Sequence, residues 1–142
     1  MLDTIYTELI LSHNQSGHNK GELVKPDFAQ RGHNPNCGDD LTLMVNTRDG
    51  FVSEAKFVGL GCAISTASIS IMIDLVKGKS VEEARLLATT YFRMIRGEEI
   101  TRDDKKLLKD AGVFETLKDM PARVKCGTLG WHCLSVILDK IE

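Results

Sequence analysis

The sequence predicts one domain of mixed α and β structure, in which a β-hairpin precedes a series of helices. Residues 41–45 and 51–58 are short runs of β-favouring residues, and Thr47-Arg48-Asp49-Gly50 between them is typical of a hairpin turn. Most of the remaining segments carry apolar residues at helical spacing. Because 142 residues suffice for one hydrophobic core, we expect a single domain over residues 1–142.

The part of the chain before the hairpin predicts one helix and one extended segment. Residues 2–14 have the pattern of an amphipathic helix that ends before Ser16-Gly17. Its apolar stripe consists of Leu2, Ile5, Tyr6, Leu9 and Ile10. Residues 17–33 are rich in Gly, Asn, His and charge, so we expect an extended approach to the hairpin, with residues 22–24 as the only hint of a strand.

Two helices are predicted directly after the hairpin. Cys62 follows the second strand and precedes small and hydroxyl-bearing residues, which places it at a strand-to-helix turn. The helix after Cys62 is expected to run to Lys77 and to stop at Gly78. The next helix begins at Ser80 with the spacing of a capping box and ends at Gly97. Its predicted core face consists of Ala84, Leu87, Ala88, Tyr91 and Ile95.

The C-terminal part of the sequence predicts further helices. Residues 98–110 are highly charged and indicate a short surface helix, and residues 113–117 indicate another that breaks near Pro121. A last helix is expected over residues 127–141. Cys126 is therefore placed at the start of this helix.

Composition and charge limit the cellular compartments and the partners that we expect for this protein. The net charge of −2 at pH 7 leaves no basic excess for binding nucleic acid. We find neither the pattern of a signal peptide nor an apolar segment of membrane-spanning length, so we expect a cytoplasmic protein without a membrane partner. In that reducing compartment, the four cysteines are expected to be metal ligands or reactive thiols rather than disulfides.

The candidate site begins at Asn34-Pro35-Asn36-Cys37-Gly38-Asp39-Asp40, a turn-forming stretch that carries a thiol and carboxylates. The hairpin brings Cys37 and Asp39 at its entry to the same end of the sheet as Cys62 at its exit. Cys126 can join them from the last helix. Three thiolates and one carboxylate suit a tetrahedral zinc site. The alternative is that these cysteines are dispersed as small apolar residues of the core.

Three segments resemble the cysteine motifs of the IscU/SufU/NifU-N family of iron–sulfur cluster assembly proteins: Asn34-Pro35-Asn36-Cys37-Gly38-Asp39, Gly61-Cys62-Ala63-Ile64-Ser65 and Lys125-Cys126-x-x-Leu129-x-Trp131. Their order also matches, and the resemblance covers nearly the whole chain. It implies an α+β fold, with a small antiparallel sheet packed by helices and a metal site at one tip. The implied partner is a cysteine desulfurase that delivers sulfur.

Two features resemble the SufU branch of this family more than its IscU branch. Lys125 stands where the IscU branch has a histidine before the third cysteine, and residues 98–114 resemble the additional segment of the SufU branch. This resemblance implies a zinc-dependent sulfurtransferase-like protein that accepts persulfide sulfur from a SufS-type desulfurase and passes it to downstream SUF scaffold proteins. The alternative implied by the wider family is a scaffold that holds iron or a transient iron–sulfur cluster on the same thiols.

Within the SufU-like hypothesis, we predict Cys37 as the sulfur acceptor, because its loop is the most flexible of the three ligand segments; Cys126 is the alternative acceptor. Asp39 is predicted to hold the zinc together with Cys37, Cys62 and Cys126. Arg123 and Lys125 are expected to orient the incoming sulfur or to be solvated charges. A third hypothesis is a binding module in which zinc only stabilises the fold.

The other candidate residues are assigned to structure rather than chemistry. Cys133 lies two helical turns after Cys126, too far to share one ion, so we expect it in the core. Trp131 is expected in the core or at a partner contact. His13, His18 and His33 lie in polar surroundings and are expected at the surface, with His33 able to approach the site.

Overall fold

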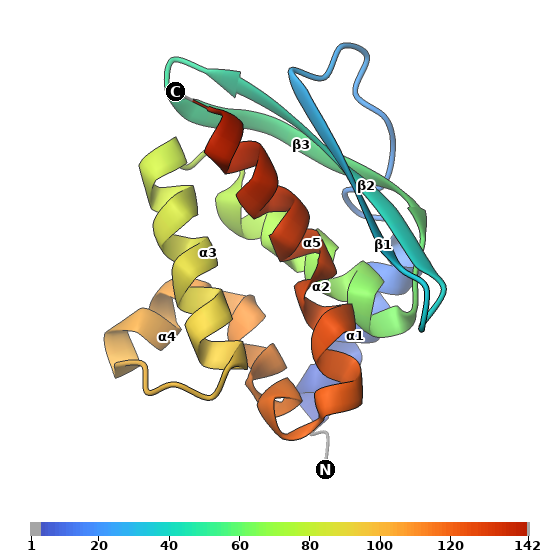
Figure 1. Cartoon of the computed structure of the whole chain (residues 1–142), viewed down its shortest axis with the longest axis vertical. Helices are drawn as coiled ribbons and strands as arrows, with labels where there is room; N and C mark the ends of the chain where they lie inside the picture. Colours follow the sequence, from blue (N-terminus) through green and yellow to red (C-terminus); the bar gives the residue numbers. More distant parts are fainter. Residues whose placement is uncertain (1–3, 142) are drawn as a thin grey trace.

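A three-stranded antiparallel sheet forms one side of the molecule and helices form the other (Figure 1). The computed structural model describes residues 4–141, and the side chains from residue 8 onward. The strands are β1 (Phe28–Asn34), β2 (Asp39–Arg48) and β3 (Phe51–Leu60), and they pair in the order β1-β2-β3. The predicted hairpin is therefore confirmed as β2 and β3, with both strands longer than their apolar runs.

The helical part follows the sheet except for one helix at the N-terminal side. Its elements are α1 (Thr4–Ser16), α2 (Ala63–Val76), α3 (Val81–Ile95), α4 (Arg102–Leu108), the 3₁₀ helix η1 (Lys109–Asp119) and α5 (Pro121–Lys140). Helices α2 and α5 pack on each other and against the sheet, and α3 lies on their far side (Figure 1). The α+β class predicted from the sequence is confirmed by this arrangement.

The core lies between the sheet and helices α2 and α5. Strand β2 turns Leu41, Leu43 and Val45 inward, and all three are fully buried, as the two-residue period of a strand requires. The indole of Trp131 stacks on the ring of Tyr91 from α3, with centroids 4.1 Å apart. This stack joins α5 to α3 and confirms that Trp131 is a core residue.

The helix predicted to begin at Ser80 is confirmed as α3. Ser80 caps α3, because its hydroxyl accepts a hydrogen bond from the backbone N–H of Glu83. The predicted core face of this helix is buried in every position: Ala84, Leu87, Ala88, Tyr91 and Ile95. The charged segment after Gly97 is shorter than expected, since α4 covers only Arg102–Leu108 and the 3₁₀ helix η1 continues from it.

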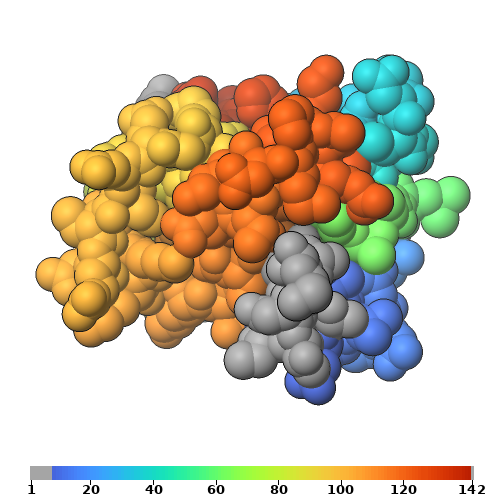
Figure 2. Space-filling model, turned by 90° about the horizontal axis from the view of Figure 1, so that it is seen from below, coloured from blue at the N-terminus to red at the C-terminus, as the bar shows by residue number. Residues whose placement is uncertain are grey.

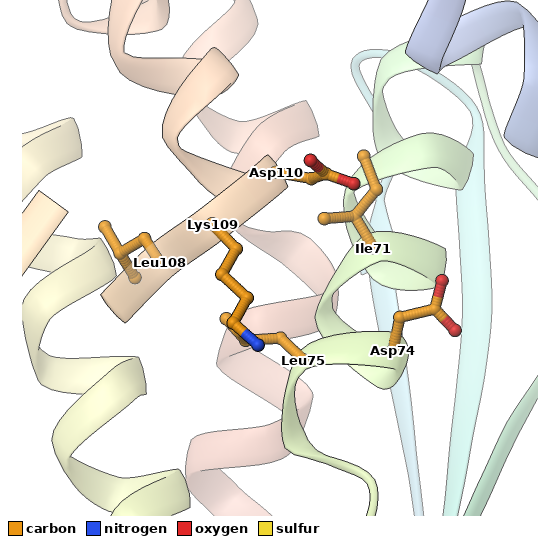
Figure 3. A pocket seen from close by; sticks show the side chains of 6 residues that line it. All are labelled: Ile71, Asp74, Leu75, Leu108, Lys109 and Asp110. Carbon is orange, nitrogen blue, oxygen red and sulfur yellow. The ribbon is translucent and has the colours of Figure 1, made fainter. Parts of the chain in front are cut away.

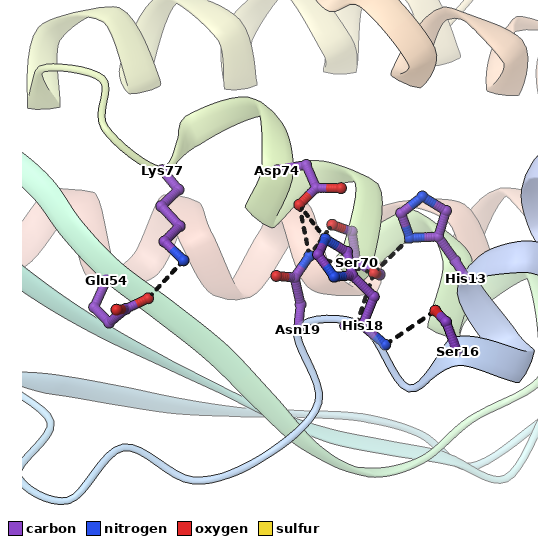
Figure 4. Close-up of polar contacts among 8 residues, drawn as sticks. All are labelled: His13, Ser16, His18, Asn19, Glu54, Ser70, Asp74 and Lys77. Atoms are coloured by element: carbon purple, nitrogen blue, oxygen red, sulfur yellow. Dashed lines mark hydrogen bonds and ion pairs between the residues drawn. The ribbon is translucent and has the colours of Figure 1, made fainter.

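The N-terminal helix is attached to α2 by hydrogen bonds (Figure 4). His13 Nδ1 lies 2.6 Å from Ser70 Oγ, and His18 Nε2 lies 2.7 Å from Asp74 Oδ1. Asn19 adds a bond to the Ser70 carbonyl oxygen at 2.9 Å. His13 is thus half-buried and structural rather than a free surface residue. Helix α1 begins at Thr4, so Leu2 and the side chains of Ile5 and Tyr6 lie outside the described part.

The strand β1 was not predicted, and the hint of a strand at residues 22–24 was wrong. Strand β1 alternates half-buried and exposed residues but is mostly polar, so it lacks an apolar pattern. It forms because β2 offers a pairing partner along its whole length, from Phe28 opposite Val45 to Asn34 opposite Asp39. Pairing with a neighbour outweighs the weak local preference here.

The start of the last helix was also predicted wrongly. Helix α5 begins at Pro121, so this proline occupies the first turn, where its missing N–H is no loss, rather than breaking a helix. Cys126 consequently lies in the second turn of α5 and not at its start. Among the helices described in residues 4–141, none combines the length and hydropathy that crossing a membrane requires.

Candidate metal and thiol site

The turn between β1 and β2 presents Cys37 at one end of the sheet. The backbone N–H of Cys37 donates to the carbonyl oxygen of Asn34 at 3.2 Å, which closes the turn. Gly38 has φ = 72°, a left-handed conformation that favours glycine. The chain can therefore reverse immediately after Cys37, and the Cys37 thiol is exposed.

Asp39 is the first residue of β2 and is completely buried. Its Oδ1 accepts hydrogen bonds from the Cys62 backbone N–H at 2.8 Å and from Ser65 Oγ–H at 3.1 Å. Its Oδ2 is buried and has no hydrogen-bond partner among the described residues. Because a buried carboxylate oxygen is costly without a partner, the free Oδ2 indicates a position for a cation.

The neighbouring Asp40 is turned away from this position. Its carboxylate accepts two hydrogen bonds from the Arg31 guanidinium on β1, at 2.7 and 2.8 Å. Arg31 holds the pKa of Asp40 below its usual value, mainly through this hydrogen bonding. Asp40 is thus engaged on the exposed side of the sheet, and Asp39 alone of the pair faces the thiols.

Cys62 lies at the strand-to-helix turn that the sequence predicted, where it is the N-cap of α2. Its Sγ accepts a weak hydrogen bond from the backbone N–H of Ser65 at 3.4 Å, and the thiol is half-buried. The Ser65 hydroxyl also lies 3.1 Å from the Cys62 carbonyl oxygen. Ser65 therefore links the N-cap of α2 to Asp39. Ser65 belongs to the second cysteine motif, but no role was predicted for it from the sequence.

Cys126 approaches the same point from α5. Its Sγ lies 3.4 Å from Cys37 Sγ, and the residue is only 2% exposed. Burial and hydrogen bonds with Cys37 and Cys62 raise the pKa of the Cys126 thiol far above its usual value. Cys126 lies in the second turn of α5 rather than at its start, so the helix N-terminus does little to counter this shift.

The ligand atoms of Cys37, Asp39 and Cys126 all lie within 4.8 Å of one another. One ion bound at about 2.0–2.3 Å by sulfur and oxygen requires ligand atoms roughly 3.3–3.8 Å apart, so small side-chain adjustments suffice. The two sulfurs and the free Asp39 Oδ2 fit a zinc ion or another thiophilic metal. The predicted metal site at one tip of the fold is thus matched by a group of residues that could hold an ion.

Cys62 is outside this group of three. Its Sγ interacts with Cys126, since it contributes to the raised pKa of that thiol, but it is held by the N–H of Ser65. For Cys62 to serve as a fourth ligand, its Sγ must turn from the cap toward the other three. The four-residue ligand set therefore stays a prediction.

A hollow of about 380 Å³ opens beside Cys37, between the β1–β2 turn and the first turns of α5. Figure 2 shows this turn (cyan) next to the early part of α5 (orange-red) and the start of α2 (green). We call it the Asn34 hollow; it is lined by Asn34, Asn36, Cys37, Pro121, Ala122 and Lys125. Lys125 thus lies beside the thiol, whereas the exposed Arg123 does not line the hollow.

The remaining candidate residues do not belong to the group of Cys37, Asp39 and Cys126. Cys133 is buried in the core against Gly32 of β1, as expected. Burial raises its pKa to about 11. His33 is exposed and lines a second hollow of about 420 Å³ that it shares with Asn34, Lys125 and His132.

A separate small cavity of about 80 Å³ lies between α2 and η1 (Figure 3). It is lined by Ile71, Asp74, Leu75, Leu108, Lys109 and Asp110. It contains no thiol and no imidazole, and its size is that of a few water molecules at most. This cavity is therefore not a candidate for thiol chemistry.

A small antiparallel sheet covered on one face by helices, with two thiols and a carboxylate converging at one end, defines a class of small α+β proteins built around a cysteine site. The model of the NifU-like N terminal domain matches residues 5–140. The chain belongs to this family, which includes the IscU and SufU proteins. The resemblance drawn from the three cysteine motifs is therefore confirmed.

The relatives carry names from both branches. The chain is 39% identical over 138 residues to the iron–sulfur cluster assembly scaffold protein IscU of Thermotoga maritima, covering 97% of this chain and 95% of the relative. It is 38% identical over 141 residues to the zinc-dependent sulfurtransferase SufU of Bacillus subtilis, covering 99% and 94%. The crystal structure of FiSufU from Fervidobacterium islandicum AW-1 is similar, with a TM-score of 0.85, 31% identity and coverage of 94% and 96%.

Proposed function

We propose that this protein accepts persulfide sulfur from a SufS-type cysteine desulfurase for iron–sulfur cluster assembly, with Cys37 as the acceptor. The observation that carries the proposal is the contrast between an exposed Cys37 thiol and its buried neighbours Asp39 and Cys126. A sulfur atom carried on another protein must meet an exposed thiol. The B. subtilis relative is a zinc-dependent sulfurtransferase by name, which supports the same activity.

The transfer step needs no oxidant beyond the persulfide itself. The Cys37 thiolate attacks the outer sulfur of the desulfurase persulfide, and the sulfur–sulfur bond to the desulfurase breaks. The desulfurase cysteine leaves as a thiolate, and Cys37 becomes the persulfide. Atoms, charge and oxidation state balance, because one sulfur–sulfur bond replaces another. The Cys37 persulfide then offers its outer sulfur to a downstream SUF scaffold protein in the same kind of exchange.

Zinc is the metal that we propose for the site. Cys37, Asp39 Oδ2 and Cys126 would hold it, with Cys62 as the fourth ligand. Bound zinc stabilises deprotonated thiolates, which offsets the burial that raises the pKa of Cys126. The hydrogen bond from Ser65 to Oδ1 holds the Asp39 carboxylate in place. The exposed turn that carries Cys37 is the ligand segment that another protein can reach.

The second candidate function is that of a scaffold, on which a transient iron–sulfur cluster is assembled. The two cysteines and the carboxylate at one end of the sheet also suit iron, and the T. maritima relative is named a scaffold. The observation that favours sulfur acceptance is Lys125, which stands before Cys126 and beside Cys37 and cannot ligate iron as a histidine can.

One experiment separates these functions. The purified protein with its native metal content is incubated with a SufS-type desulfurase and cysteine, and intact and digested protein are analysed by mass spectrometry. We expect one added sulfur on Cys37 in the parent and in Cys133→Ser, a control for a thiol outside the site, and none in Cys37→Ser. An added sulfur on Cys126 alone would contradict the assignment, and bound iron with sulfide but no persulfide would favour the scaffold.

A further inference from the structure

A groove on the helical side of the molecule exposes two leucines. It lies between α3 and the segment formed by α4 and the start of η1, on the side of α3 away from the sheet (Figure 1), and its volume is about 240 Å³. Leu86 of α3 is 54% exposed, Leu107 of α4 is 45% exposed, and the buried Leu87 also lines the groove. We call it the α3–α4 groove. It is smaller than the roughly 300–1,000 Å³ of pockets for drug-sized molecules, so it suits the side chains of a protein segment.

Three lysines surround these leucines. Lys79, Lys106 and Lys109 line the groove, and none of them forms an ion pair with another residue that the structure describes. Among the described residues that line it, the one carboxylate is that of Glu83, which accepts a hydrogen bond from the Ser80 hydroxyl at 3.3 Å. The groove therefore carries a net positive charge, although the net charge of the whole chain is −2. An apolar strip flanked by cations is complementary to an apolar strip flanked by carboxylates.

Lys109 has a backbone conformation that favours glycine. It joins α4 to η1 with φ = 48° and ψ = −126°. A lysine is less stable than a glycine in this conformation, because its Cβ is crowded by the backbone. Its side chain also borders the small cavity of Figure 3, but it forms no ion pair there with Asp74 or Asp110. The described part of the fold thus gives no electrostatic reason for a lysine at this position.

The groove is separate from the cysteine site. None of the residues that line it also lines the Asn34 hollow beside Cys37. In Figure 2 the segment that carries α4 (yellow-orange) and the β1–β2 turn (cyan) lie on opposite sides of the view. A segment bound in the groove would leave Cys37 reachable, so docking in the groove does not depend on the proposed function.

We propose that the α3–α4 groove docks an acidic amphipathic helix of a partner protein. Apolar side chains of that helix fill the space between Leu86 and Leu107, and its carboxylates pair with the three lysines. Helices form this groove, so it offers no strand edge, and a helix laid into a groove is the recognition mode that applies. A lipid bilayer is a poorer occupant, because it is flat and because anionic lipids repel a chain of net charge −2.

The first test uses a synthetic peptide. A fluorescein-labelled helical peptide with a leucine stripe between two rows of glutamates is titrated with the full-length protein, and binding is followed by fluorescence anisotropy. We expect binding that weakens as the salt concentration rises, since exposed charges are screened. A peptide with serines in place of the leucines, and one with lysines in place of the glutamates, should each bind about tenfold more weakly or worse.

Variants of the groove locate the binding surface. Leu107→Gln should weaken peptide binding about tenfold, because less apolar surface is buried. Lys106→Glu should weaken it about fivefold, because an attraction becomes a repulsion. The matched controls are Leu11→Gln, at a leucine on α1 that is 49% exposed, and Lys140→Glu, at the last residue of α5. Neither control should change the affinity.

Lys109→Gly separates docking from stability. It should raise the urea concentration at the midpoint of unfolding, because glycine accepts the backbone conformation of residue 109. It should nevertheless weaken peptide binding about threefold, because one cation is lost. A lysine that only supported the fold would not change in opposite directions in these two measurements.

The proposal is overturned if the parent does not bind the acidic peptide, or if the parent, Leu107→Gln and Lys106→Glu bind it equally. Two further measurements test other occupants. Cosedimentation with vesicles that contain phosphatidylglycerol, or a dimer in analytical ultracentrifugation, would overturn the assignment to a partner helix if Leu107→Gln abolished it. None of these measurements requires a persulfide on Cys37, so failure of the proposed function would leave them unchanged.

Discussion

Asp39 has two oxygens with different partners, so two substitutions can separate its structural contribution from metal binding. Asp39→Ala removes Oδ1, the acceptor for the Cys62 N–H at 2.8 Å and for Ser65 Oγ–H at 3.1 Å. Asp39→Asn keeps an oxygen acceptor for both donors but replaces Oδ2 by an amide group that cannot bind a cation. Both variants lose the negative charge, so their difference reports the two hydrogen bonds together with the small cavity that alanine leaves.

The magnitude follows from the donors that are left behind. In Asp39→Ala the Cys62 N–H loses its acceptor in a half-buried position, which costs about 1–3 kcal/mol. The Ser65 hydroxyl loses less, because the Cys62 carbonyl oxygen at 3.1 Å is an alternative acceptor. With the small cavity left by the carboxylate, metal-free Asp39→Ala should lose about 2–4 kcal/mol. Metal-free Asp39→Asn should be at least as stable as the parent, since burying a neutral amide costs less than burying a carboxylate.

The order of stabilities should therefore reverse with metal. Urea unfolding is measured for the parent and both variants, in the presence of a chelator and in the presence of zinc. With chelator we expect Asp39→Asn to equal or exceed the parent and Asp39→Ala to be the least stable. With zinc the parent should become the most stable, because it alone keeps the oxygen ligand. Equal stability of the two variants without metal, or equal stabilisation of the parent and Asp39→Asn by zinc, would refute this reasoning.

Two further predictions concern parts of the fold away from the metal. Burial lowers the pKa of His13 and the neighbouring His18 lowers it further, whereas Asp74 and Asp110 partly oppose this shift, so the unfolded chain binds this proton more readily. The contribution of His13 to stability should be present above its ordinary pKa of 6.5 and should be lost as the pH falls below that value. In His13→Asn the melting temperature should therefore change less between about pH 7.5 and 5.5 than in the parent. An equal change of melting temperature in both proteins would contradict this prediction. Gly32→Ala should lower the free energy of unfolding by about 1–3 kcal/mol, because the added Cβ would lie 2.6 Å from Cys133 Sγ. In a double-mutant cycle measured by urea unfolding, Cys133→Ala should restore part of this loss. Additive effects of the two substitutions would contradict the contact.

Local sequence patterns predicted the hairpin, the caps and most helices because these elements depend on neighbouring residues. Strand β1 could not be predicted in this way, since its polar residues become a strand only by pairing with β2. The start of α5 was missed because Pro121 was expected to break a helix, whereas it occupies the first turn of one. Gly127 and Gly130 also disfavour a helix by roughly 1 kcal/mol each, yet both lie within α5.

The glycines of α5 are explained by packing that the sequence does not reveal. A Cβ on Gly130 would lie 2.7 Å from Ile69 of α2, and one on Gly127 would meet Leu117 of η1. The glycines thus allow the helix to approach its neighbours closely, and burial outweighs their poor helical propensity. Propensity alone could not show this, because the residues involved are distant in sequence.

The convergence of the thiols could be predicted in outline but not in detail. The hairpin geometry was enough to expect Cys37 and Asp39 at one end of the sheet, and the structure brings both together with Cys126. The sequence could not show that Ser65 holds Asp39 or that the Asn34 amide lacks a partner. Those facts depend on which atoms of a side chain are already hydrogen-bonded, and only the packed structure determines that.

The different burial of the thiols bears on the proposed role of Cys37 as sulfur acceptor. A thiol reacts as its thiolate, and burial raises the pKa of Cys126, which disfavours its thiolate. A persulfide on a desulfurase must also reach its acceptor, and Cys126 is only 2% exposed. Cys37 lies 3.4 Å away, on an exposed turn and beside Lys125. Access and reactivity therefore both support the proposal that Cys37, rather than Cys126, is the sulfur acceptor.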